Sequence, residues 1–168
     1  LTFAAGFGGI DPALLPEGHA GQPTGAIAEI APARSAIMQA ISDRLFNSGG
    51  TALFIDYGHL EPGFGDTLQA VLDHRFDPPL AHPGLADLTS HVDFENLART
   101  ALAAGVHLNG CMHQGDFLVG LGIEQRAASL GRDKDEAKQA EIVDALHRLA
   151  GTYRMDTAFG SVFNAGAL

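Results

Sequence analysis

Hydrophobic and polar positions along this chain form two clear patterns, which predict a helix followed by a strand. Apolar residues spaced three and four apart over residues 32–46 form the stripe of an amphipathic helix. The nearly continuous apolar run over residues 51–57 predicts a strand buried in a parallel sheet. This strand ends in Asp56, Tyr57 and Gly58, at the carboxyl edge where open α/β sheets bind ligands.

The same reasoning predicts the remaining elements. Strands are expected over residues 1–6, 106–112 and 157–165, and helices over residues 94–104, 114–122, 123–131 and 133–153. The segment 59–90 is rich in proline and glycine, so it is expected to be irregular apart from a short helix over residues 67–74. Helices alternating with strands indicate an α/β sheet, but two or three strong strands are too few for a complete one. Because the chain also begins at Leu1, we interpret it as a piece of a larger protein.

The composition narrows the function classes. The 168 residues include 20 acidic residues and 10 Lys or Arg, which gives a net charge of −10. An acidic chain without a basic stripe binds nucleic acid poorly, because phosphate contacts supply most of that affinity. No apolar run approaches the roughly 20 residues of a membrane span. The single cysteine, Cys111, cannot form an internal disulfide, which favours a reducing compartment.

Several familiar chemical motifs are absent. The glycine-rich residues 6–11 are expected to form a turn, because prolines follow them where a nucleotide-binding loop would run into a helix. The eight histidines are scattered without HExxH or CxxC spacing, so no metal site is expected. The chain has no GxSxG nucleophile elbow, which disfavours an α/β hydrolase.

Polar residues at strand ends and in the long loop are candidate site residues, each with a structural alternative. Asp56 either bonds loop amides or orients a ligand group. Tyr57 either packs or covers a ligand, and Asp93 either caps a helix or takes part in chemistry. Positions in loops and at helix starts complete the set: Asp66, Gln69, His91, Gln114 and Gly115.

Four motifs, in this order and spacing, carry a family resemblance. They are GGTALFIDYGH from Gly49, GDTLQAV from Gly65, PGLADLTSHVDFENLA from Pro83 and QGDFLVGLGIEQRA from Gln114. The series resembles the carboxyl half of the MidA-type methyltransferases, which are class I S-adenosylmethionine-dependent enzymes. One mitochondrial branch of that family assists the assembly of respiratory complex I. The resemblance covers the chain from about residue 26 to residue 163.

The resemblance implies a partial class I, Rossmann-like methyltransferase fold. This α/β fold has a mostly parallel sheet with a closing antiparallel strand pair, and here its amino-terminal half would be missing. Residues 1–168 would form the carboxyl-terminal part of one methyltransferase domain, with residues 59–91 as an inserted loop region on the substrate side. Residues 51–57 would be the fifth strand, and residues 106–112 and 158–163 the closing pair. The family's glycine-rich cofactor loop and ribose-binding acid would lie upstream.

The resemblance also implies an activity, which is methyl transfer from S-adenosylmethionine to a protein arginine, with a complex I subunit as substrate in the mitochondrial branch. Since the main cofactor site is expected outside this chain, the segment alone is expected to be inactive and to hold no cofactor-binding residues. The alternative is a non-catalytic protein-interaction domain that retains the fold. A homodimer is left open. A bacterial cytoplasm is expected, with the mitochondrial matrix as the alternative.

The family's functional positions carry over onto ten residues. The catalytic set comprises Asp56, Tyr57, Asp66, His91 and Asp93. The substrate-binding set comprises Gly58, Thr67, Gln69, Gln114 and Gly115. Carboxylates of this kind orient a guanidinium through paired hydrogen bonds and share its charge, and no general base is assigned among them.

Overall fold

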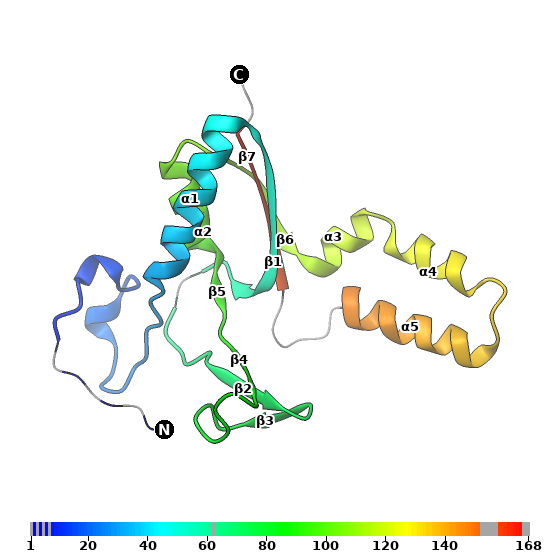
Figure 1. The fold of residues 1–168 in the computed structure, drawn as a ribbon, viewed down its shortest axis with the longest axis horizontal. Coiled ribbons are helices and arrows are strands. Elements are labelled where there is room, and N and C mark those ends of the chain that lie inside the picture. Colours follow the sequence, from blue (N-terminus) through cyan, green and yellow to red (C-terminus); the bar gives the residue numbers. More distant parts are fainter. Residues whose placement is uncertain are drawn as a thin grey trace.

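A computed structural model describes residues 2, 4, 6, 8–61, 63–151 and 158–165, the last range by its backbone alone. Two short 3-10 turns come first, at Pro12–Leu14 and His19–Gly21. The other elements follow in the order α1 (Pro32–Ser48), β1 (Gly50–His59), β2 (Gln69–Leu72), β3 (Arg75–Asp77), β4 (Asp87–Thr89), β5 (Val92–Asp93), α2 (Phe94–Ala103), β6 (His107–His113), α3 (Gln114–Gly120), α4 (Ile123–Gly131), α5 (Glu136–Ala150) and β7 (Ala158–Ala165). Figure 1 shows a central sheet with two helices beside it, a small projecting sheet and a helical lobe.

The main sheet has the strand order β5-β1-β7-β6, so the last strand of the chain lies between two earlier ones. β7 runs antiparallel to β1 from Gly50 opposite Ala165 to Tyr57 opposite Ala158. It is also antiparallel to β6, with an irregularity between Leu108 and Gly110. The predicted closing antiparallel pair is therefore confirmed. Parallel pairing within the described residues is limited to β1 with β5.

The hydrophobic core lies where α1 and α2 meet one face of the sheet (Figure 1). Its fully buried side chains come from both helices and from the residue before β6; they are Met38, Phe94, Ala101 and Val106. β1 contributes Ala52 and Phe54 to this core, whereas Leu53, Ile55 and Tyr57 on the opposite face are each about half exposed. The described residues thus bury β1 on one face only, although the apolar run predicts burial on both.

The predicted short helix over residues 67–74 is wrong. β2 and β3 form an antiparallel hairpin there, and β4 pairs with the other edge of β2. Asp73 and His74 make the turn with φ values of 50° and 62°, and two consecutive left-handed residues are the hallmark of a tight hairpin turn. Asp tolerates this conformation better than most residues, so the turn chemistry outweighed the helical spacing of the apolar residues.

The amino-terminal strand predicted over residues 1–6 has no counterpart in the described residues. Leu1, Phe3 and Ala5 lie outside them, and Thr2, Ala4 and Gly6 are not in a strand. The glycine-rich stretch leads into the 3-10 turn at Pro12–Leu14, where the Asp11 side chain accepts the N–H of Ala13. The interpretation of that stretch as a turn, and not as a nucleotide-binding loop, agrees with this geometry.

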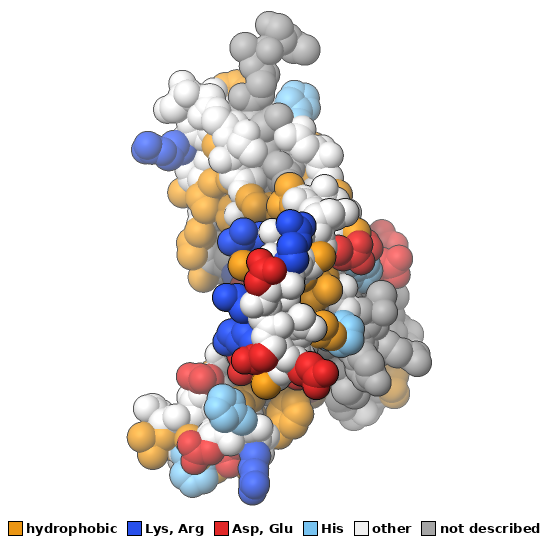
Figure 2. Space-filling model, turned by 90° about the vertical axis from the view of Figure 1, so that its right-hand side faces the viewer, with side chains coloured by type: hydrophobic (Ala, Val, Ile, Leu, Met, Phe, Trp, Pro, Cys, Tyr) orange, Lys and Arg blue, Asp and Glu red, His pale blue; other side chains and the backbone are white. Residues whose placement is uncertain are grey.

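Helices α3, α4 and α5 form a lobe beside the sheet, as Figure 1 shows. The three helices predicted here are confirmed, with the last one beginning at Glu136, since Asp135 caps it by accepting the N–H of Lys138. Tyr153, in the predicted continuation of that helix, lies outside the described residues. Figure 2 views the molecule from the lobe side and shows Lys, Arg, Asp and Glu side chains interspersed with hydrophobic ones. No helix in the part of the chain that the structure describes has the length and apolar content needed to cross a membrane.

Candidate functional site

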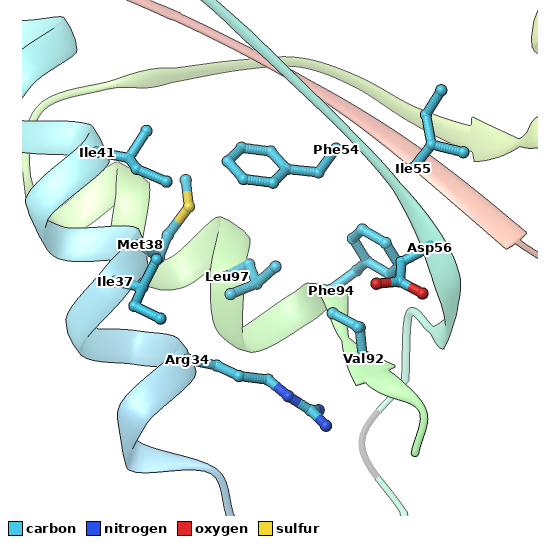
Figure 3. Close-up of a pocket in the computed structure, with 10 residues that line it drawn as sticks. All are labelled: Arg34, Ile37, Met38, Ile41, Phe54, Ile55, Asp56, Val92, Phe94 and Leu97. Atoms are coloured by element: carbon cyan, nitrogen blue, oxygen red, sulfur yellow. The ribbon is translucent and has the colours of Figure 1, made fainter. Parts of the chain in front are cut away.

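A cavity of about 250 Å³ lies between α1, β1 and α2 at the carboxyl end of β1 (Figure 3). Its lining is apolar apart from one arginine and one aspartate; it comprises Arg34, Ile37, Met38, Ile41, Phe54, Ile55, Asp56, Val92, Phe94 and Leu97. The carboxyl end of β1 is where the sequence pattern predicted a ligand crevice. The cavity lining therefore includes both the leading candidate, Asp56, and a cationic residue that the sequence analysis missed, Arg34.

Asp56 lies on the core side of β1, the side to which Phe54 points. Its carboxylate accepts the N–H of Tyr57 at 2.8 Å and is solvent-exposed. Tyr57 points to the opposite face of the strand and is 54% exposed. The structure thus places these two predicted catalytic residues on different sides of the sheet, so Asp56 alone faces the cavity.

Arg34, in the first turn of α1, lines the cavity and holds the loop that precedes β5. Its guanidinium donates to the carbonyl oxygen of His91 at 2.5 Å and to the hydroxyl of Ser90 at 2.5 Å. Both contacts are partly buried and span more than fifty residues of sequence. A charged donor with two fixed acceptors orders a loop more strongly than a neutral one does.

Thr67 and Glu29 complete a polar network that we call the loop clamp, made of Glu29, Arg34, Thr67, Ser90 and His91. The Glu29 carboxylate accepts the N–H of Thr67 at 2.9 Å and also its hydroxyl. The Thr67 oxygen in turn accepts the N–H of His91 at 2.9 Å. The loop clamp therefore connects Thr67 and His91, which lie on either side of β2, β3 and β4, to Glu29 and Arg34 at the start of α1.

The other predicted acids in this region have structural partners. Asp66 accepts the N–H of Leu68 at 3.2 Å just before β2, which begins at Gln69. Asp93 caps α2 by accepting the N–H of Asn96 at 2.9 Å, which confirms the structural alternative for this residue. Roles for these acids in catalysis, and for Gln69 in binding, stay predictions.

The close approach of β5 requires a glycine at position 58. A Cβ at this position would lie 2.2 Å from the carbonyl oxygen of Val92 and 2.8 Å from the Phe94 ring. Only glycine allows the strand end, β5 and the start of α2 to meet this closely. Packing therefore explains why a glycine follows Asp56 and Tyr57 in this chain.

Gln114 and Gly115 lie at the start of α3 and contact the end of α5. The Gln114 side-chain amide donates to the carbonyl oxygen of Leu149 at 2.9 Å. A Cβ on Gly115 would lie 2.9 Å from the carbonyl oxygen of Ala150. Both residues therefore contact the carboxyl end of α5 within the helical lobe, and the structure does not bring them to the cavity lining. Their predicted part in substrate binding is untested.

Glu29, Arg34 and Ser90 are the polar residues that the sequence analysis missed. Glu29 and Arg34 flank the start of α1 within an otherwise apolar and small-residue stretch, and Ser90 directly precedes His91. A charged residue on each side of a helix start, near the carboxyl edge of the predicted strand, was the available signal. Among the described residues, no group of three or more His, Cys, Asp or Glu side chains is arranged to hold a metal ion.

Together, the sheet order and the cavity indicate the class of protein to which the chain belongs. The chain forms an α/β sheet whose last strand lies antiparallel between two earlier ones, and Arg34 and Asp56 line a cavity at the carboxyl end of β1. A protein-family model described as "Putative S-adenosyl-L-methionine-dependent methyltransferase" matches residues 11–112, and the chain belongs to this family.

Curated relatives agree with the family match. The chain is 35% identical over 124 residues to "Protein arginine methyltransferase NDUFAF7 homolog, mitochondrial" of Caenorhabditis elegans, covering 73% of this chain and 29% of the relative. It is 40% identical over 127 residues to "Protein arginine methyltransferase NDUFAF7, mitochondrial" of Mus musculus, covering 76% and 27%. The chain therefore spans about 30% of the length of the curated relatives it matches.

A solved structure shares the fold. A Burkholderia thailandensis protein, described as a COG1565 superfamily member and likely methyl transferase bound to S-adenosyl-homocysteine, superposes with a TM-score of 0.67 and 27% identity. The match covers 82% of this chain and 38% of that one. The resemblance to the arginine methyltransferase family and the partial methyltransferase fold are thereby confirmed.

Proposed function

We propose that this chain is the carboxyl-terminal part of an S-adenosylmethionine-dependent methyltransferase that methylates a protein arginine. One observation carries the proposal: the chain matches curated arginine methyltransferases and shares the fold of a protein bound to S-adenosyl-homocysteine. The cavity at the carboxyl end of β1, with Asp56 beside it, supplies a position for a substrate side chain.

We expect the described residues not to form the cofactor site themselves. Such a site needs a glycine-rich loop that runs into a helix amino terminus, whereas the glycine-rich stretch here ends in a proline-containing 3-10 turn. We therefore expect the main S-adenosylmethionine site to lie outside this chain and the chain alone to be inactive. S-adenosylmethionine supplies an electrophilic methyl group, so the enzyme mainly has to align the nucleophile and exclude water.

Asp56 is the residue that we assign to the arginine. Its carboxylate faces the cavity, is exposed and accepts a backbone N–H from Tyr57 through one oxygen, so further oxygen lone pairs stay available for a guanidinium. The carboxylates of Asp66 and Asp93 instead accept the amides of a turn and a helix start. The apolar lining of the cavity, which includes Phe54, fits the aliphatic stem of an arginine that reaches Asp56.

The proposed substrate is a basic segment of a protein, and in the mitochondrial relatives' branch a subunit of complex I. The net charge of −10 favours encounter with a cationic substrate. The compartment would then follow the source of the gene, a bacterial cytoplasm or a mitochondrial matrix. A homodimer stays open.

Two measurements test the proposal. Calorimetry of this chain with S-adenosylmethionine should show no micromolar binding, and such binding would contradict a cofactor site elsewhere. Mass spectrometry should then find methylated arginine when the chain is placed in a complete methyltransferase domain, with little transfer after Asp56→Asn. Asp144→Asn, a change of the same chemistry at an exposed position of α5, serves as the control and should leave the transfer unchanged.

The second candidate is a protein-interaction domain that retains the fold. Exposed large apolar side chains on the helical lobe, such as Leu121 and Leu149, favour it. The same mass-spectrometry experiment separates the two candidates. An interaction domain would yield no methylated arginine in a complete domain that binds S-adenosylmethionine, and would capture a partner through the lobe.

A further inference from the structure

We propose that Arg34 is a second contact point for the substrate, where its guanidinium binds a carboxylate that lies close in sequence to the target arginine. This inference rests on the proposed function, because there Asp56 is the residue that takes the arginine itself. It deepens that function by naming a sequence preference, for an arginine with an aspartate or a glutamate near it, and by making Arg34 the residue that determines this preference.

The first observation is that the partners of Arg34 are neutral. Its guanidinium donates to the hydroxyl of Ser90 and to the carbonyl oxygen of His91, and both contacts are partly buried. Within the described residues, no carboxylate forms an ion pair with Arg34. A guanidinium has more N–H groups than these contacts use, so it can still donate to a further acceptor. A partly buried charge gains most from an acceptor of opposite charge.

The second observation is the position of Arg34 in its helix. Arg34 lies in the first turn of α1, and this turn contains no acidic residue. The N-cap residue, Ala31, offers no side-chain hydrogen bond to the helix. The amino end of a helix carries partial positive charge, so it repels a cation and attracts an anion. An arginine at this end is therefore unfavourable for the helix and favourable for binding an anion.

The third observation is that Arg34 and Asp56 line one cavity, whose other lining residues are apolar. Figure 3 shows the Arg34 side chain extending from α1 toward Val92 of β5, while Asp56 lines the cavity from β1. In the part of the chain that the structure describes, no ion pair joins the two residues. A ligand with a positive and a negative group near each other would pair with both of them.

The loop clamp orients the guanidinium for this contact. Its two terminal nitrogens donate to neighbouring residues of one loop, Ser90 and His91, which fixes the plane of the group. Thr67 holds the same loop by accepting the N–H of His91 at 2.9 Å. A charged group that is oriented before the ligand arrives loses less side-chain freedom on binding. The loop clamp therefore favours recognition by Arg34.

The choice of a carboxylate follows from the size of the cavity and from the kind of substrate. A volume of about 250 Å³ is below the roughly 300–1,000 Å³ of typical small-molecule pockets, so it suits side chains of a bound protein segment. The planar fork of a guanidinium matches the two oxygens of a carboxylate. Aspartate and glutamate bring that group on the same polypeptide as the target arginine.

The test measures arginine methylation by a complete methyltransferase domain that contains this chain. The substrates are peptides with one arginine and a glutamate at successive positions on either side of it, each compared with the matching glutamine peptide. For at least one placement, we expect the glutamate peptide to have a kcat/KM about tenfold higher, through a lower KM, because it forms a charge-assisted hydrogen bond. Arg34→Gln should bring this ratio to about one.

Two control variants separate this role from the stability of the loop. Arg44→Gln makes the same change of charge at an exposed position of α1 and should leave the ratio unchanged. Ser90→Ala removes one acceptor of Arg34 but keeps the guanidinium itself, so the preference for glutamate should persist. The net charge of −10 acts against a glutamate peptide, so a preference for it reports a local contact.

Three results would overturn the inference. The first is equal kcat/KM for the glutamate and glutamine peptides at every placement. The second is an unchanged ratio in Arg34→Gln, even with lower activity, because Arg34 would then only hold the loop. The third is a preference that Ser90→Ala abolishes as fully as Arg34→Gln does.

The proposed function fails in a different way, when the complete domain binds S-adenosylmethionine but methylates no arginine. Fluorescence anisotropy of the same peptides then still measures whether glutamate strengthens binding. A tighter complex with the glutamate peptide that Arg34→Gln weakens would support the contact at Arg34. Equal binding of both peptides would overturn it.

Discussion

The sheet side of the molecule and the helical lobe are stabilised in different ways. On the sheet side, α1 and α2 bury Met38, Phe94 and Ala101 almost completely against β1 and β6. In the lobe, α3, α4 and α5 contain no buried residue at all. The lobe depends on caps and side-chain contacts to backbone, such as those of Asp135 and Gln114. Buried apolar area stabilises far more than exposed hydrogen bonds do, so we expect the sheet side to dominate the stability.

The largest expected effect comes from the core. Phe94→Ala should lower the free energy of unfolding by about 3–5 kcal/mol, because it removes a fully buried ring. Val143→Ala on α5 should cost about 0.5 kcal/mol or less, because that side chain is half exposed. Urea denaturation of both variants measures the difference. Equal costs would mean that the lobe has a core of its own.

The next effect concerns the close approach at the end of β1. Gly58→Ala should cost about 2 kcal/mol, because the new methyl group would overlap the Val92 carbonyl and the Phe94 ring. Gly120→Ala in the lobe is the matched control, since a methyl group added there would have nothing within 4 Å of it. Thermal denaturation compares the two. A similar change in both would contradict the packing explanation for Gly58.

A smaller effect is expected in the loop clamp. Thr67→Val removes the hydroxyl that bonds Glu29 and the His91 N–H, and should cost about 1 kcal/mol. Exchange of the His91 amide should become faster, whereas Thr67→Ser should preserve it. An unchanged exchange rate of the His91 amide in the Thr67→Val variant would show that Arg34 and Ser90 hold this loop without Thr67.

The smallest effect lies in the lobe. Gln114→Ala should cost about 0.5 kcal/mol, since its exposed amide donates a single hydrogen bond to the Leu149 carbonyl. Amide exchange should speed up in the last turn of α5 only. Gln125→Ala, on α4, should leave α5 unchanged. Faster amide exchange throughout α3, α4 and α5 in the Gln114→Ala variant would mean that this contact stabilises the whole lobe.

The sequence predicted the elements whose local signals agree with their packing. The stripe of α1, the apolar run of β1 and the Asp93 cap each placed an element correctly, because periodicity and capping act within a few residues. The hairpin at Asp73 and His74 was missed because two left-handed residues decide a turn that apolar spacing does not reveal.

The candidate site was predictable only in part. Asp56 follows from its place at a strand end, since that position is local information. Arg34 and Glu29 were missed, because their partners lie more than thirty residues away in the chain. Tyr57 was grouped with Asp56 because they are adjacent, yet strand alternation sends neighbouring side chains to opposite faces. Long-range contacts and face assignment therefore limit what the sequence indicates about this site.

We propose above that this chain contributes the arginine-facing part of a methyltransferase. The most direct measurement is mass spectrometry of arginine methylation by a complete methyltransferase domain that contains this chain, with labelled S-adenosylmethionine and a complex I preparation as substrate. We expect methylated arginine with the native chain, and at least about tenfold less with Asp56→Asn, because a carboxylate that orients the nucleophile is lost. Methylation that is unchanged by Asp56→Asn, or absent from a complete domain that folds and binds S-adenosylmethionine, would contradict the proposed function.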